Sequence, residues 1–108
     1  MRKPLCVAVF LLLASHLLAQ GGPRVTGVDP ASGKVGATVA ATGENLGKGT
    51  VIAVYLSDVN TDYRATVAEQ TPEKIVFRVP QVKPGSYNVS IQVRNEIFIQ
   101  PIRFTVEE

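Results

Sequence analysis

The chain has very few residues of the kinds that carry nucleophilic, metal or redox chemistry. Its 108 residues include one cysteine, one histidine, one methionine and no tryptophan. The cysteine, Cys6, and the histidine, His16, both lie within the first twenty residues. Without that segment, Ser-His-Asp or Cys-His catalysis and zinc sites with Cys or His ligands are excluded, and no disulfide can form. The sequence therefore predicts a non-catalytic domain, with no cofactor, that its core alone must stabilise.

The first twenty residues have the composition of a secretory signal peptide. Arg2 and Lys3 precede an apolar run from Pro4 to Leu13, and the small residue Ala19 follows near the end of the segment. The alternative, a membrane anchor, needs a longer run of about 20 apolar residues. We therefore predict a signal peptide over residues 1–20, cleaved after Ala19 or Gln20, and one domain over residues 21–108. The mature chain is expected to be secreted or periplasmic, with no membrane attachment once the signal is removed.

Removal of this segment also changes the charge of the chain. The precursor has 11 basic and 9 acidic residues, for a net charge of +2. Arg2 and Lys3 leave with the signal, so 9 basic residues remain against 9 acidic ones, and the net charge falls to 0. Nucleic-acid affinity depends on a basic surface. The mature chain is therefore not expected to bind nucleic acid.

The remainder of the chain reads as a series of short strands separated by turns. Turn signals recur about every 8–12 residues, the spacing of an all-β sandwich. We expect seven strands near residues 24–28, 37–42, 51–57, 64–69, 74–79, 86–94 and 97–106. The predicted core is the inward-facing apolar set Val25, Val28, Val39, Ile52, Val54, Leu56, Val67, Ile75, Phe77, Val79, Tyr87, Val89, Ile91, Val93, Ile102, Phe104 and Val106.

One stretch, residues 29–47, organises the rest of the chain. Pro30 fixes its own φ and favours an extended Asp29. Gly33 and Gly36 suit turn positions. The alternation of residues 38–42 then predicts a short strand with one buried side, which Gly43 is expected to break.

This stretch resembles the start of an IPT/TIG domain, an immunoglobulin-like module of plexin-type receptors, some transcription factors and many bacterial secreted proteins. That family reads roughly P-x-I-x-x-V-x-P-x-S-G-x-x-G-x-x-V-x-I-x-G-x-N-F. The matching residues here are Pro23, Val25, Val28, Pro30, Ser32, Gly33, Gly36, Val39, Ala41, Gly43, Asn45 and Leu46. Later segments, 54–56, 75–80, 84–89 and 104–106, are also similar to strands of the family. The resemblance implies an immunoglobulin-like β-sandwich of about seven strands, but implies little about function because the family has unrelated roles.

A calcium loop is the most tempting local motif. Asp58, Asn60 and Asp62 alternate as oxygen ligands do, and Glu69 stands at the twelfth position, where an EF-hand has its bidentate carboxylate. The sixth position, however, is Tyr63 rather than glycine, and no helix is expected on either side. A solvated hairpin tip, rich in turn-forming Asp and Asn, explains the segment better. No metal site is predicted, and the glycosylation tripeptide at Asn88 lies in the middle of a strand.

The last two predicted strands are joined by an unusually apolar segment. If Phe104 and Ile102 face inward, Phe98 does too, and Ile97 and Ile99 then face outward. The same alternation places Tyr55 outward, so that Tyr55, Gln92, Arg94, Ile97 and Ile99 form one candidate interaction face. The alternatives are ordinary β-propensity at a sheet surface, or a bulge at Pro101 that turns both isoleucines inward.

Together these features predict an exported, non-catalytic immunoglobulin-like binding or assembly module. Protein–protein recognition at the cell surface or in the periplasm is the first hypothesis. An accessory polysaccharide-binding module is the alternative, because similar domains accompany carbohydrate-active enzymes. Exposed aromatic rings would favour the second hypothesis, and Tyr55 and Tyr63 are the candidates that the sequence offers.

Overall fold

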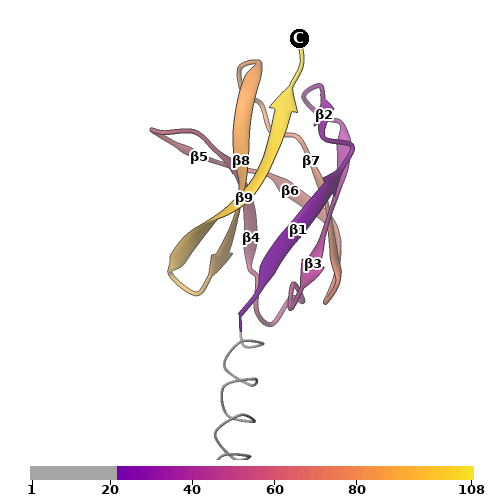
Figure 1. The fold of residues 1–108 in the computed structure, drawn as a ribbon, viewed down its shortest axis with the longest axis vertical. Helices are drawn as coiled ribbons and strands as arrows, with labels where there is room; N and C mark the ends of the chain where they lie inside the picture. The colour runs from indigo at the N-terminus through magenta and orange to yellow at the C-terminus, as the bar shows by residue number, and fades with distance from the viewer. Residues whose placement is uncertain (1–21) are drawn as a thin grey trace, which may run out of the picture.

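The structure, a computed structural model, describes residues 22–108. The predicted signal peptide, residues 1–20, lies outside the described residues. Residues 22–108 form two β-sheets that pack face to face, as predicted (Figure 1). No helix in this range is long and apolar enough to cross a membrane.

Four antiparallel strands form the first sheet, in the order β1-β3-β7-β6. Their bounds are β1 Arg24–Asp29, β3 Thr38–Glu44, β7 Lys74–Arg78 and β6 Thr66–Thr71. Gly43 was expected to end the strand that contains it, and this expectation is wrong. β3 continues through Gly43 to Glu44, and Gly43 pairs with Val25 of β1.

Five strands form the second sheet, in the order β2-β9-β8-β4-β5. Their bounds are β2 Ser32–Gly33, β9 Glu96–Val106, β8 Gly85–Val93, β4 Ala53–Ser57 and β5 Asp62–Arg64. β2 is parallel to β9, and the other pairs are antiparallel. The chain between residues 22 and 108 thus has nine strands rather than seven. The predicted strand 64–69 is in fact parts of two, because the chain crosses between the sheets at the buried Ala65, whose N–H donates to the carbonyl of Val54.

The core lies between the two sheets and contains most of the predicted residues. Phe77, Phe104, Leu56, Ile75 and Ile91 are among its largest fully buried side chains. Val28 and Ile102 are only partly buried, as is Val93. The expectation of buried side chains at Ile52 and Val67 is wrong, since both are exposed. Val51, Ala53 and Ala65 are buried instead, although they were not in the predicted core.

Tyr87 fixes the loop that leads into β8. Its hydroxyl donates a hydrogen bond of 2.6 Å to the carbonyl oxygen of Lys83, the arrangement called a tyrosine corner in immunoglobulin-like sandwiches. Its ring also meets Tyr63 edge to face, with ring centroids 6.1 Å apart. Burial of the phenol raises the pKa of Tyr87, and the nearby Tyr63 and Asp58 raise it further.

Candidate interaction face

The candidate face lies on the side of the five-stranded sheet that points away from the core, which we call the outer face. Strand register determines which side chains share it. Gln92 pairs with Ile97, and Ser90 pairs with both Ile99 and Tyr55. Because directly paired residues point to the same side of a sheet, Tyr55, Gln92, Ile97 and Ile99 share the outer face.

Arg94 occupies a different position from the other four predicted residues. It lies in the two-residue turn between β8 and β9, where Val93 pairs with Glu96. Its φ is +57°, a value that is unusual for a residue other than glycine. Its carbonyl accepts a hydrogen bond of 2.8 Å from Nε2 of Gln92, so the turn is tied to the outer face although Arg94 is not in a strand.

An irregularity in β9 determines which way its two exposed isoleucines point. Asn88 pairs with Arg103 and Ser90 pairs with Ile99, so Gln100, Pro101 and Ile102 stand opposite the single residue Val89. The bulge suggested near Pro101 is therefore present, but it adds two residues rather than one. Since side chains alternate with period 2, an insertion of two keeps Ile97 and Ile99 on the outer face.

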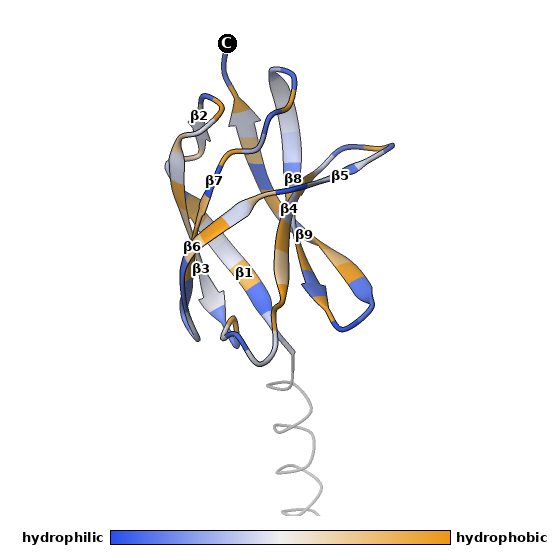
Figure 2. Ribbon diagram, turned by 180° about the vertical axis from the view of Figure 1, so that it is seen from behind, coloured by the Kyte–Doolittle hydropathy of each residue, from blue (hydrophilic) through white to orange (hydrophobic). Residues whose placement is uncertain are grey.

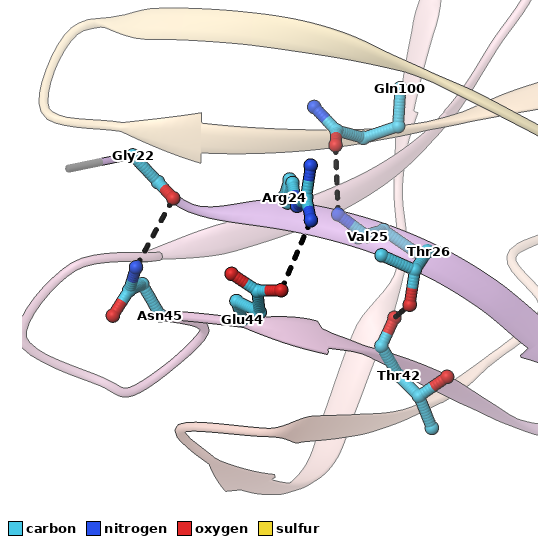
Figure 3. Close-up of polar contacts among 8 residues, drawn as sticks. All are labelled: Gly22, Arg24, Val25, Thr26, Thr42, Glu44, Asn45 and Gln100. Atoms are coloured by element: carbon cyan, nitrogen blue, oxygen red, sulfur yellow. Dashed lines mark hydrogen bonds and ion pairs between the residues drawn. The ribbon is translucent and has the colours of Figure 1, made fainter. Parts of the chain in front are cut away.

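Gln100, inside this bulge, joins the two sheets. Its Oε1 accepts a hydrogen bond of 2.8 Å from the backbone N–H of Val25 in β1 (Figure 3). Its Nε2 donates to the carbonyl of Phe98, at 3.3 Å. Gln100 is only 7% exposed. Sequence reasoning did not single out this residue, because a glutamine in an apolar strand gives no indication of which backbone group it will pair with.

The end of the β8–β9 hairpin is apolar on both of its sides. Ile97 and Ile99 on the outer face are 38% and 63% exposed, and Phe98 on the opposite side is 44% exposed. Phe98 pairs with the buried Ile91, so it does lie on the core side as expected. It is nevertheless exposed because the lower part of the hairpin extends away from β1 and β3, as Figures 1 and 2 both show.

Polar side chains dominate the outer face beyond the two isoleucines. The hydroxyl of Tyr55 donates to Oε1 of Gln92 at 2.5 Å. The hydroxyls of Ser57 and Ser90 lie 2.8 Å apart and are buried between neighbouring strands. Arg103 donates from Nη2 to the hydroxyl of Ser86, at 2.7 Å, and both residues line a hollow of about 260 Å³ together with Ile99. The face is thus an apolar patch at the hairpin with an ordered polar surface beside it.

The carboxylates of the calcium-like segment are used in other ways. Oδ1 of Asp58 accepts hydrogen bonds from the backbone N–H groups of Asn60 and Thr61, at 2.9 and 2.8 Å. Asp62 accepts from the hydroxyl of Ser57, at 2.6 Å. Glu69 lies in β6 of the other sheet. Residues 22–108 contain no group of three or more His, Cys, Asp or Glu side chains placed to hold a metal ion.

Comparison with known proteins agrees with this architecture. Among solved structures, the chain is similar to a protein of unknown function from Bacteroides thetaiotaomicron, with a TM-score of 0.70 and 23% identity over 80% of this chain and 22% of that one. It is also similar to the plexin A4 extracellular region, with a TM-score of 0.63 and 19% identity over 79% of this chain and 8% of that one.

A third similar structure is the protein SGBP-B of a Bacteroides ovatus mixed-linkage glucan utilization locus, in complex with a mixed-linkage heptasaccharide. Its TM-score is 0.55, with 16% identity over 80% of this chain and 23% of that one. The chain spans less than a quarter of the length of each of these three proteins, and the identities support a shared fold alone. No curated protein matches the chain. The IPT/TIG domain family, in contrast, matches residues 23–106, and the chain therefore belongs to this family.

Proposed function

We propose that this protein is an exported, non-catalytic binding module that recognises another protein through the outer face at the β8–β9 hairpin. The observation that carries the proposal is the exposure of Ile97 and Ile99 on a regular sheet face. An apolar centre with a polar rim is the usual composition of a protein–protein interface. Tyr55 and Gln92 supply the adjoining rim, already joined by a hydrogen bond.

Export rests on the basic and apolar residues at the start of the chain, from Arg2 to Ala19. The proposed location is the cell surface, the periplasm or the medium. The similar plexin A4 structure is an extracellular region, in agreement with this location.

Polysaccharide binding is the alternative, and the similar SGBP-B structure contains a heptasaccharide. Stacking on a sugar requires an accessible aromatic face. Tyr55 is half-buried with its hydroxyl bound to Gln92, and Tyr63 is half-buried against Tyr87. Phe98 is the most exposed aromatic ring in residues 22–108, at 44%, but its neighbours Ile97 and Ile99 are apolar, so this surface suits a protein partner better than a polysaccharide.

The test replaces Ile97 and Ile99 together with threonine in the full chain. Threonine retains the β-branch and the strand preference, and both positions are exposed, Ile99 more than Ile97. We therefore expect a loss of unfolding free energy of about 1 kcal/mol or less. Ile91→Thr, on the buried side of the same hairpin, should cost about 1–3 kcal/mol or more, because it buries a hydroxyl. Urea titration measures both.

Binding is measured in parallel on the immobilised full chain, with surface proteins and soluble polysaccharides of the source organism as separate probes. The double variant should lose protein retention, whereas Val35→Thr, exposed in the turn between β2 and β3, should keep it. Retention of proteins by the double variant at the original level would contradict the proposal. Retention of a polysaccharide alone would favour the alternative.

A further inference from the structure

The first half of β9 is an open edge of the five-stranded sheet. β9 pairs with β8 on one side along most of its length. On its other side β2 pairs only with Thr105 and Val106. Within residues 22–108, no strand therefore pairs with the outer edge of residues 96–99.

The backbone groups on this edge can be assigned from the hairpin register. Arg94 and Asn95 form a two-residue turn, and Val93 pairs with Glu96. The pair that closes such a turn exchanges both backbone hydrogen bonds, and the direction then alternates along the strand. The N–H and C=O groups of Glu96 and Phe98 thus point to β8, while those of Ile97 and Ile99 point to the open side.

The other sheet edges of the described chain carry features that discourage pairing. β1 and β6 each contain a register shift, and β6 also carries the charged Glu69. β2 has two residues, and β5 has three, of which two are charged. Bulges, charges and short length are the usual protections of sheet edges. Residues 97–99 of β9, between the charged Glu96 and the bulge at residues 100–102, contain no charge, proline or bulge of their own, and all three side chains are apolar and exposed.

We propose that this edge pairs, antiparallel, with the same edge of a second copy of the chain about a twofold axis at Phe98. The inference goes beyond the proposed outer-face recognition, because it depends on the backbone edge. In this register Ile97 of each copy lies opposite Ile99 of the other copy. The outward-pointing N–H and C=O groups of both residues therefore all find hydrogen-bond partners. Glu96 lies opposite Gln100, so no like charges meet across the axis.

Other symmetric registers of this edge use fewer of its groups. An axis at Ile97 places Ile99 opposite the turn residue Asn95. An axis at Ile99 places Ile97 opposite Pro101, which has no N–H to donate. The axis at Phe98 is therefore the register that this sequence favours, and it joins two five-stranded sheets into one continuous sheet with an isologous interface.

The exposed apolar area indicates how strong the pairing is. The three side chains are 38%, 44% and 63% exposed, which amounts to roughly 300 Å² per copy if a large apolar side chain presents about 150–250 Å². Two copies then bury less than the ~1,200 Å² of a stable complex. The expected dimer is weak, with a dissociation constant of about 10 μM to 1 mM.

Site-specific disulfide formation tests both the dimer and its register. The full chain carries Cys6→Ser, which removes the only thiol, and then either Ile97→Cys or Ile99→Cys. In the proposed register residues 97 and 99 of opposite copies have Cα atoms about 5.5 Å apart, which suits a disulfide. Two copies of the same variant place their cysteines on a diagonal of about 7–8 Å, which is too long.

An equimolar mixture of the two variants, one of them extended by a tag, should therefore form mixed disulfides at least about tenfold faster than either variant alone. A mixture that reacts no faster than the separate variants would overturn the proposal, and so would faster reaction of Ile97→Cys alone. Oxidation of Val35→Cys, in the turn between β2 and β3, gives the rate for an exposed site away from the hairpin.

Sedimentation velocity of the full chain provides the second readout. Ile99→Pro removes an N–H that faces solvent in the monomer, so the strand should survive while the association constant falls at least about tenfold. Ile99→Val retains both the N–H and the apolar side chain, and should retain the dimer. An unchanged dimer in Ile99→Pro overturns the edge pairing, as does a chain that stays monomeric at about 1 mM. Either result leaves the outer-face proposal to be decided by its own binding test.

Discussion

Replacement of Gly43 by alanine should show how closely β1 approaches β3. Gly43 pairs with Val25 near the register shift of β1. A Cβ added at Gly43 would lie 2.0 Å from the carbonyl oxygen of Arg24, and 3.0 Å from both the carbonyl carbon of Arg24 and the Cα of Val25. All three are backbone atoms, so no change of rotamer relieves the overlap, and β1 itself must move by about 1 Å.

The cost can be worked out from what that movement breaks. Val25 donates to Oε1 of Gln100 at 2.8 Å, and Asn45 donates from Nδ2 to the carbonyl of Gly22 at 3.2 Å, on either side of the overlap (Figure 3). Loss of two such hydrogen bonds costs about 1–3 kcal/mol in total. Overpacking adds about 1–3 kcal/mol. We therefore expect Gly43→Ala to lower the free energy of unfolding by about 3 kcal/mol.

Urea titration of the full chain, followed by circular dichroism, measures this loss, and two other glycines serve as controls. An added Cβ at Gly49 meets nothing within 4 Å, and at Gly27 its nearest atom is Oγ1 of Thr42 at an ordinary 3.6 Å. Gly49→Ala should be neutral or stabilise the fold by about 0.4–1 kcal/mol, and Gly27→Ala should cost far less than Gly43→Ala. If Gly43→Ala were as stable as Gly49→Ala, the close approach of β1 and β3 would be refuted.

Three further outcomes are expected. The raised pKa of Tyr87 means that the folded state holds the phenol proton more strongly than the unfolded state does. This contribution to stability is present below about pH 10 and is lost as the pH rises through the pKa of the folded state. In alkali, the urea midpoint of Tyr87→Phe should therefore fall less steeply than that of the parent. The intact mass of the exported protein should match a chain that begins at Gln20 or Gly21. A mass that includes Met1 would contradict the proposed signal peptide. Millimolar calcium should leave the melting temperature unchanged, because the carboxylate of Asp58 already accepts two backbone N–H groups; a rise of several degrees that Asp58→Ala abolishes would show a calcium site.

The alternation of apolar residues and the spacing of turn residues predicted most of the architecture, because both depend on neighbours in the sequence. The alternation of β8 places Tyr87, Val89 and Ile91 in the core, as period-2 reasoning expects. Gly43 illustrates the limit of such reasoning. The family motif identified this glycine, but a role as a strand breaker was inferred from residue type. Its place is set instead by the backbone of β1, almost twenty residues earlier in the chain.

The alternation of side chains along a strand predicts only the side of the sheet to which a residue points. Whether that residue is buried depends on whether another part of the protein covers that side. Phe98 is on the core side of β9, but the opposite sheet does not extend over the end of the hairpin. Ile52 is exposed just before the start of β4, where it lines a hollow with Pro23, Val93 and Arg94. The outward direction of Ile97 and Ile99 could be predicted from the alternation of side chains along the strand. The sequence could not predict that their strand lies at an open edge, because strand order depends on the whole sheet.

The bulge at Gln100 links the stability of the sandwich to its exposed hairpin. The backbone N–H of Val25, next to the register shift of β1, donates to the side chain of Gln100. Gln100 itself lies in the bulge, outside the regular pairing of β9 with β8. The segment before the bulge then extends past the sandwich, where neither β1 nor β2 pairs with its edge. The residue that ties the two sheets together is thus also the point from which the apolar edge of Ile97, Phe98 and Ile99 becomes available to a partner.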